Sequence, residues 1–193
     1  MTSYLISESK FDGSVRRFVK DILTLVKLKG EGNYSLPEDL NSEELVYLMK
    51  EIENPLTLSV NISENNEIDD VEVDADYYRD EDVIEVTVLL NPFKKEKIYQ
   101  KLIGKLNETI RHELEHISQY QRGVVFPKEP KRPIDFYLQR HELEAQVAGF
   151  RRRARKEKRE LEDVMREWFN ENKKYHRLKD FEVERVIKKL LEI

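Results

Sequence analysis

The chain has 193 residues, a formal net charge of −5 and no cysteine. Because 39% of its residues are hydrophobic it can bury a core, and the lack of cysteine excludes disulfides, thiolate metal ligands and a cysteine nucleophile. The first residues do not have the pattern of a signal peptide, and no apolar run reaches the roughly 18 residues of a membrane span. We therefore expect a cytoplasmic protein that does not contact membranes.

The first part of the chain predicts two helices. Apolar residues recur at helical spacing in residues 14–28, and the glycines of "KGEGNY" (29–34) then interrupt the pattern. A second, short helix is predicted at 41–52, because Asn41 or Ser42 can cap its start and Pro55 follows its end.

Three strands of a small sheet are predicted next. "LTLSVNI" (56–62) and "VEVDADYY" (71–78) alternate between apolar and polar residues, and "DVIEVTVLL" (82–90) is rich in β-branched residues. The third of these strands could pair its edge with an extended peptide. A long amphipathic helix is predicted from about 95 to 119, then a proline-containing loop, then helices near 139–158, 159–172 and 178–192. Helices before and after the strands, rather than between them, indicate an α+β fold.

Two charged segments have alternative interpretations. Residues 64–82 carry ten acidic side chains and one basic one, and a solvated sheet face that prevents edge aggregation is the favoured explanation. Calcium or a basic partner is the alternative, although the strict alternation does not fit an EF-hand loop. Residues 151–159, "RRRARKEKR", continue a helix without interleaved aromatic residues, so a solvated helical face is favoured over a nucleic-acid contact.

Residues 112–116 read HELEH, an HExxH motif. Residues four apart on a helix lie one turn above each other, so His112 and His116 can clamp one metal ion. Glu113 is rotated by about 100° from His112, which is too far for a third ligand but close enough to reach a metal-activated water. A chance match is the alternative, but the motif lies in the middle of a helix that follows a β-branched strand, which favours a site. Glu113 is then the candidate general base.

A catalytic zinc site usually has three protein ligands and one position for water, so a third ligand must lie elsewhere. The metzincin extension is excluded, because it needs glycine and histidine where the chain has Gln119 and Arg122. The remaining donors include His141, Glu142, Glu144 and His176.

Helix geometry separates two of these donors only modestly. Glu142 and Glu144 flank the core stripe of the helix near 139–158 on opposite sides. The side of Glu144 carries the small Ala148, which lets a neighbouring helix approach, and the side of Glu142 carries Gln146 and Gly149. Glu144 is slightly preferred.

An HExxH motif followed by a glutamate within an E-x-E-A segment resembles the gluzincin group of zinc metallopeptidases. More narrowly, "YLQRHELEAQVAGFRRRARK" (137–156) resembles a segment of small metallopeptidases of tailed bacteriophages, with similarity over about residues 83–155. The resemblance implies that His112, His116 and Glu144 bind zinc and that Glu113 is the base.

The chain departs from this family pattern at His141, where the family often has proline or an acidic residue. His141 is then an ordinary residue of the first helical turn, the third ligand, or a donor that stabilises the oxyanion of the transition state. Tyr137 and Tyr120 compete for this last role. His176 lies in a polar segment between two predicted helices, and we expect it at the surface.

Together these patterns predict an α+β protein with a minimal zincin-like fold. It would contain N-terminal helices, a small three-stranded sheet, the HExxH helix, a second ligand-bearing helix and C-terminal helices. Residues 1–158 would form the catalytic domain, and residues 159–193 a helical extension that packs on it.

The expected function is zinc-dependent hydrolysis of peptide bonds in a protein or peptide substrate, in the host cytoplasm if the protein is phage-encoded. Zn²⁺ would activate a water from which Glu113 takes the proton, and His141 is the second candidate catalytic residue. The alternative is a zinc-containing binding or regulatory protein with little or no proteolysis, in contact with nucleic acid through residues 151–159.

Overall fold

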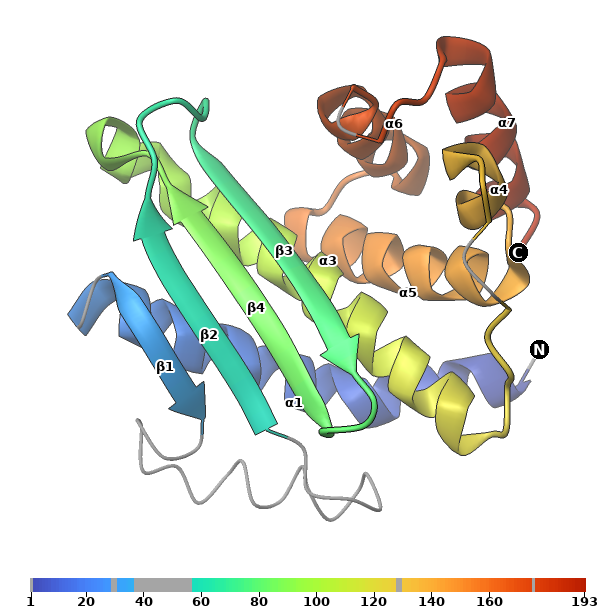
Figure 1. Cartoon of the computed structure of the whole chain (residues 1–193), viewed down its shortest axis with the longest axis horizontal. Helices are drawn as coiled ribbons and strands as arrows, with labels where there is room; N and C mark the ends of the chain where they lie inside the picture. Colours follow the sequence, from blue (N-terminus) through green and yellow to red (C-terminus); the bar gives the residue numbers. More distant parts are fainter. Residues whose placement is uncertain (1, 29–30, 37–56, 128–129, 175) are drawn as a thin grey trace.

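The computed structural model describes residues 2–28, 31–36, 57–127, 130–174 and 176–193 (Figure 1). The first half of the chain contains the helix α1 (Thr2–Leu28) and the strands β1 (Gly32–Leu36), β2 (Thr57–Glu64), β3 (Val71–Tyr78) and β4 (Val83–Leu90). A 3-10 turn, η1 (Pro92–Lys94), leads into the helices α3 (Lys95–Gln121), α4 (Pro133–Tyr137), α5 (Arg140–Glu157), α6 (Leu161–Asn172) and α7 (Asp180–Leu191). The α+β class is confirmed.

Most helices lie where hydrophobic periodicity predicts them. α1 begins earlier than expected, at Thr2, whereas α3, α5, α6 and α7 agree with the predicted ranges to within a few residues. The short helix α4 lies in the segment expected to be a loop and begins at Pro133, a residue that suits the first helical turn because no N–H is needed there. The helix predicted at 41–52 lies outside the described residues.

In the described part of the chain the sheet has four strands, in the order β1-β2-β4-β3, so the expectation of three was wrong. The missed strand, β1, pairs antiparallel with β2. It spans only the five residues from Gly32 to Leu36, and glycine there suggested a break. Its pairing with β2 provides the backbone hydrogen bonds that such a short segment needs, and these are not visible in local sequence.

The strand at the edge next to the helices is β3, not β4. β4 is parallel to β2 on one side and antiparallel to β3 on the other, so both of its edges are already paired. The expectation that this third predicted strand offers an edge to a peptide was therefore wrong. Along β3 the side chains alternate as predicted, with Val71 and its apolar partners facing the core and the acidic residues exposed.

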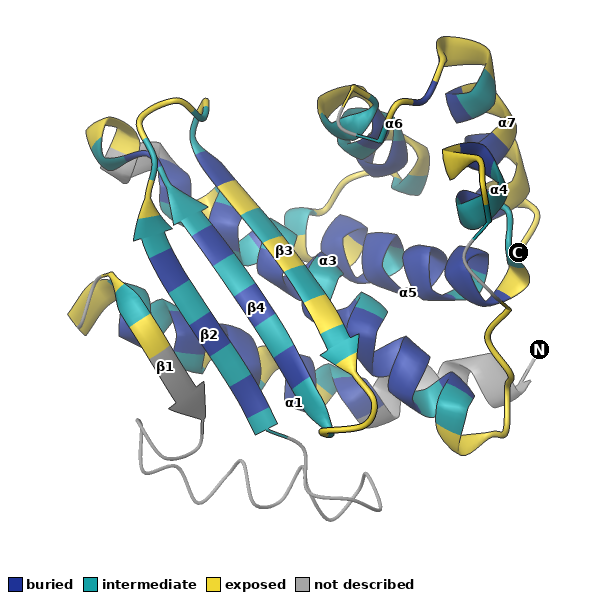
Figure 2. Cartoon of the chain, viewed as in Figure 1, coloured by how far each residue is buried: buried dark blue, intermediate teal, exposed yellow. Residues whose placement is uncertain are grey.

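Two hydrophobic clusters support the fold. The first joins α1, three strands of the sheet and α3; the second joins α4, α5, α6 and α7. Figures 1 and 2 show α1 and α3 on one face of the sheet, and α5 beside α3 with the other C-terminal helices beyond it. The predicted boundary after residue 158 falls within the second cluster and stays a prediction. The candidate site lies where α3 and α5, one from each cluster, pack together.

None of the helices in the described ranges combines the length and the apolar character that crossing a membrane requires.

Candidate metal centre

Helix α3 carries the HExxH motif, and its apolar face determines where the two histidines point. Ile110, Leu114 and Ile117 are at most 2% exposed and pack into the first cluster. The histidines lie beyond the margin of this face, towards α5. The Nε2 atoms of His112 and His116 are 3.0 Å apart, so both imidazoles present the same nitrogen to one point.

Glu142 of α5 supplies the carboxylate that faces the two histidines. Its Oε1 lies 3.5 Å from Nε2 of His116, and its Oε2 lies 3.7 Å from Nε2 of His112. The ligand atoms of the three side chains lie within 4.8 Å of one another, so this His–His–Glu group could hold a metal ion. Glu144 instead accepts a hydrogen bond of 2.8 Å from Nε of Arg140. The structure therefore replaces Glu144 by Glu142 in the predicted ligand set.

The close approach of α3 and α5 explains why Glu142 is the residue that faces the histidines. A Cβ atom added at Gly149 would lie 2.7 Å from the carbonyl oxygen of Glu108 on α3. Gly149 follows Glu142 by two helical turns and lies on the same face of α5, so α3 comes nearest to the Glu142 side. Ala148, which favoured the Glu144 side, has a side chain that keeps backbones further apart than glycine does. Gly149 was the sequence signal for the glutamate that faces the histidines.

Gln119 connects the candidate ligand His116 with the backbone of His141. His116 shares a hydrogen bond of 3.0 Å between its Nδ1 and Oε1 of Gln119, and the Nε2 of Gln119 donates to the backbone carbonyl of His141 at 2.8 Å. With Nδ1 engaged in this way, Nε2 of His116 is the nitrogen left for a metal. Gln119 is fully buried, and in the sequence its only visible meaning was that the metzincin glycine is absent. Its place one turn after His116 was the signal for this role.

His141 lies beside Glu142 and not among the described residues that line the neighbouring cavity. Its Nε2 is 3.3 Å from Oε1 of Glu142, and its ring stacks on Phe126 with the centroids 4.7 Å apart. This position suits a residue that orients the Glu142 carboxylate, rather than an oxyanion donor, which was one of the three roles considered for His141.

Glu113 lies next to the ligand group, with its Oε1 3.9 Å from Nε2 of His112, and it is 6% exposed. Burial, together with repulsion from Asp76 and Glu142, raises the pKa of Glu113 to about 8. A dication held beside it would favour the ionised form. Burial and a bound dication would therefore shift the pKa of Glu113 in opposite directions. A carboxyl group with a pKa near neutral could accept and return a proton.

The pKa values of two of the three candidate ligands, His112 and Glu142, shift towards the forms that bind metals. Burial, together with repulsion from His116, lowers the pKa of His112 to about 3. Burial alone would lower the pKa of His116, but its hydrogen bond and attraction to Glu142 raise it. Burial alone would raise the pKa of Glu142, but the imidazoles lower it. Glu142 is therefore held as a carboxylate and His112 as a neutral imidazole, the forms that coordinate a cation.

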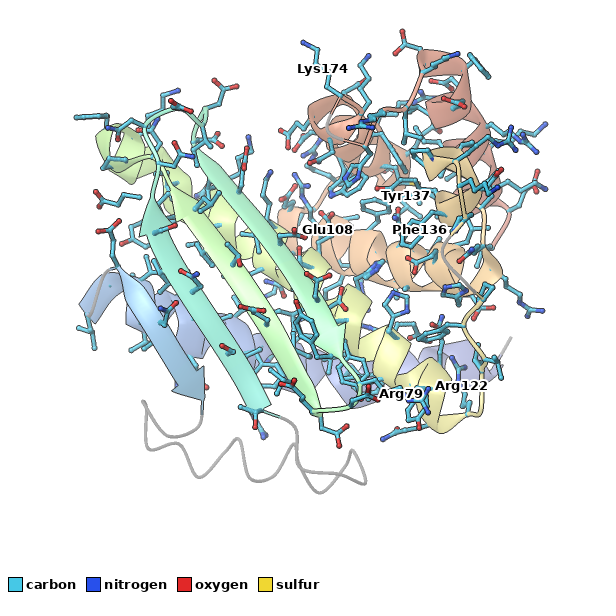
Figure 3. All side chains as sticks on the ribbon, viewed as in Figure 1. Arg79, Glu108, Arg122, Phe136, Tyr137 and Lys174 are labelled. Carbon is cyan, nitrogen blue, oxygen red and sulfur yellow. The ribbon has the colours of Figure 1, made fainter. Side chains whose placement is uncertain are left out.

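A cavity of about 1030 Å³ opens over this group, and its lining includes His112, Glu113, His116 and Glu142. β3 forms one wall and the helices α4, α5 and α6 form the other. Figure 3 labels Glu108 on α3 together with Phe136 and Tyr137 on α4, all of which line the cavity. The candidate metal group thus lies in a space large enough for a ligand.

The remaining tyrosine and histidine residues considered from the sequence differ in whether they line this cavity. Tyr137 lines the cavity, whereas Tyr120 accepts a hydrogen bond of 2.6 Å from Arg79, whose guanidinium lies over its ring. His176, expected at the surface, also lines the cavity and stacks on Trp168 with the centroids 5.5 Å apart. Of Tyr120, Tyr137 and His176, the last two therefore remain as candidates for contact with a ligand in the cavity.

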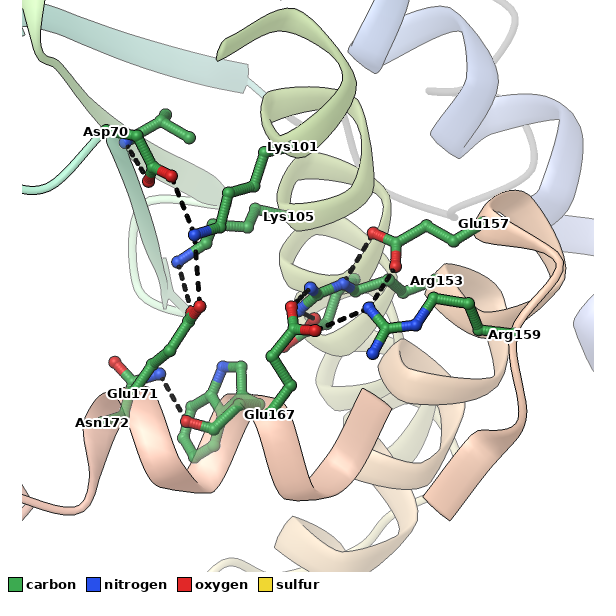
Figure 4. Close-up of polar contacts among 12 residues, drawn as sticks. Asp70, Lys101, Lys105, Arg153, Glu157, Arg159, Glu167, Glu171 and Asn172 are labelled. Atoms are coloured by element: carbon green, nitrogen blue, oxygen red, sulfur yellow. Dashed lines mark hydrogen bonds and ion pairs between the residues drawn. The ribbon is translucent and has the colours of Figure 1, made fainter. Parts of the chain in front are cut away.

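The basic segment 151–159 is only partly solvated. Arg152 and Arg153 are 5% and 1% exposed, so the favoured expectation of a solvated face was wrong for both. Arg153 donates to Glu108 on α3 at 3.0 Å, and Figure 4 shows its contacts with Glu157 and Glu167. These two arginines connect helices and are not available for phosphate groups.

The donor set fits a catalytic metal. Two imidazoles and one carboxylate form the His₂Glu combination of hydrolytic zinc sites, and a similar set can also hold non-haem iron. No model of a known protein family matches the chain at a significant level, and neither does any curated protein or solved structure.

Proposed function

We propose that this protein is a zinc-dependent metallopeptidase with a zincin-like fold. The observation that carries the proposal is the meeting of His112, His116 and Glu142 beside Glu113, in the floor of a cavity of about 1030 Å³. The nearby carboxyl group of Glu113 favours a hydrolytic zinc site over an iron site. Hydrolysis needs a general base beside the metal, whereas the oxygenation reactions of non-haem iron do not need one there.

Zinc bound by these residues would supply Lewis acidity, which polarises a carbonyl group and lowers the pKa of water to about 7. Glu113 takes a proton from the attacking water and later delivers it to the leaving amine. Its burial keeps the carboxyl group away from bulk water during both transfers. His141 and Gln119 keep Glu142 and His116 in orientation and do not touch the substrate.

Two further features of the cavity support a peptide substrate. β3 is an edge strand beside the site and can pair with an extended chain, which would place a peptide bond near Glu113. Tyr137 is one of the residues that line the opposite wall. We assign to it the stabilisation of developing negative charge that we had considered for His141.

The test combines metal analysis with turnover. Mass spectrometry of the purified protein should find one zinc per chain in the wild type and in Glu113→Gln, and none in His112→Ala. Profiling against a peptide library should show cleavage by the wild type and a loss of at least about 100-fold in Glu113→Gln, because glutamine cannot act as the base.

Glu144→Gln is the matched control, since it removes a carboxylate from the same helix outside the ligand group and should keep zinc and turnover. Iron in place of zinc would overturn the metal assignment. Stoichiometric zinc with no cleavage of any peptide would overturn the peptidase and leave a metal-containing binding protein.

A further inference from the structure

The two walls of the cavity differ in chemistry. On the β3 side the lining includes Glu72, Asp74 and Asp76, which lie on the exposed face of the strand. On the helical side it includes Phe136, Tyr137 and Trp168. A ligand in this cavity therefore meets negative charge on one side and aromatic rings on the other.

Within the described residues, the three acidic side chains of β3 form no ion pair with a lysine or arginine. The nearby lysines are bound elsewhere, Lys101 to Asp70 at 2.9 Å and Lys105 to Glu171 at 3.1 Å (Figure 4). The negative charge of this wall is thus not neutralised by the protein itself. It is available to attract a cation from outside.

The surroundings of Asp74 disfavour the charged form of its carboxyl group. Desolvation, together with repulsion from Asp76 and Glu72, raises the pKa of Asp74. A positive group placed between these carboxylates would remove this repulsion. The acidic wall therefore suits a cation that comes from outside the protein.

A separate observation points to a hydrogen-bond donor on the ligand. Gln146 lines the same cavity and is only 7% exposed, and its Oε1 has no hydrogen-bond partner. An unsatisfied buried acceptor is unfavourable, by about 1–3 kcal/mol in typical cases. A ligand that brings an N–H group would satisfy this oxygen, which is one helical turn after Glu142.

We propose that the cavity selects polypeptide segments that carry lysine or arginine, with the cationic side chain against Glu72, Asp74 and Asp76. This inference rests on the proposed peptidase function and specifies its substrate class. The segment also provides backbone N–H donors for Gln146, and its apolar neighbours contact the aromatic wall.

Binding and cleavage should be measured separately. Fluorescein-labelled peptides of one sequence, with lysine, glutamine or glutamate at the same two positions, are titrated by anisotropy with zinc-loaded Glu113→Gln. We expect the lysine peptide to bind about 10-fold more tightly than the glutamate peptide in low salt, and this difference to shrink as salt is raised, because the charges are exposed.

Two double variants in this background provide the charge test. Asp74→Asn with Asp76→Asn should weaken binding of the lysine peptide about 5-fold and remove most of the preference. Glu67→Gln with Asp69→Asn removes the same charge from exposed positions outside the cavity lining, and should change affinity less than about 2-fold.

Equal affinity for the three peptides, or equal effects of the two double variants, would overturn the inference. Cleavage by the wild type without charge preference would also overturn it and leave the peptidase intact. Tight, salt-sensitive binding of the lysine peptide without any cleavage would support the cationic ligand and overturn the peptidase.

Discussion

Two nearly identical hexapeptides, RHELEH at 111–116 on α3 and RHELEA at 140–145 on α5, have the same local structure in different surroundings. In both, the arginine pairs with the glutamate four residues later, and both N–O distances are 2.8 Å. The leucine of each hexapeptide belongs to a hydrophobic cluster. The pair on α3 is buried, with Arg111 1% exposed, whereas the Arg140 side chain on α5 is 90% exposed.

The third position of each hexapeptide faces the site, as Glu113 on α3 and Glu142 on α5. The fifth position, Glu115 or Glu144, turns back towards its arginine. Our expectation of Glu144 followed a family pattern and the position of the small Ala148 on the same side of the helix. In the first hexapeptide the third residue, and not the fifth, lies beside the histidines. The same position in the second hexapeptide is Glu142. The comparison shows that the phase of a helix decides which side chain reaches a site.

The largest expected effect separates the two glutamates of α5. Glu142→Gln should lower zinc affinity by at least about 100-fold, because the carboxylate ligand is lost. Glu144→Gln should change it by less than about 3-fold, since only the contact with Arg140 is lost. Competition with a zinc-binding dye measures both constants. A larger loss in Glu144→Gln would restore the ligand set first predicted.

The buried and exposed arginines provide the second test. Arg111→Met should lower the free energy of unfolding by about 3 kcal/mol, because Glu115 stays buried and keeps, among the described residues, only Arg122 as a partner. Arg140→Met should leave stability unchanged within error, since that side chain is solvated. Urea unfolding of the two variants gives the comparison. A gain in stability for Arg111→Met would mean that its unpaired Nε and Nη1 atoms cost more than its ion pair contributes.

The smallest effect concerns the contact that brings the hexapeptides together. Gly149→Ala should lower the free energy of unfolding by about 1–2 kcal/mol, because the new methyl group meets a backbone carbonyl of α3. It should also weaken zinc binding several-fold, since α5 must move away with Glu142.

Gly104→Ala is the control on α3. Its Cβ would meet the end of the Glu157 side chain, which can move, and would lie at the ordinary contact distance of 3.5 Å from Nε of Arg153. Alanine also favours the helix. Urea unfolding and zinc titration should show a change of less than about 1 kcal/mol and no loss of affinity. Equal losses in both variants would show that the helices do not depend on the close approach at Gly149.

Features that depend on local order could be predicted from the sequence. The one-turn spacing of His112 and His116 predicts that they project together, and apolar periodicity predicts the long helices and the alternation along β3. These features depend on backbone geometry that is the same in any helix or strand.

The choice of glutamate, the fourth strand and the role of Arg153 could not be predicted in this way. These features depend on contacts between segments that are far apart in the chain. The approach of α3 to Gly149 selects Glu142, the pairing of β1 with β2 adds a strand, and burial between helices engages Arg153. Glu142 and Leu143 are adjacent in sequence, yet Glu142 faces the histidines of α3 and Leu143 packs in the second hydrophobic cluster. The packing of α5 against its neighbours decides which of the two residues faces the site.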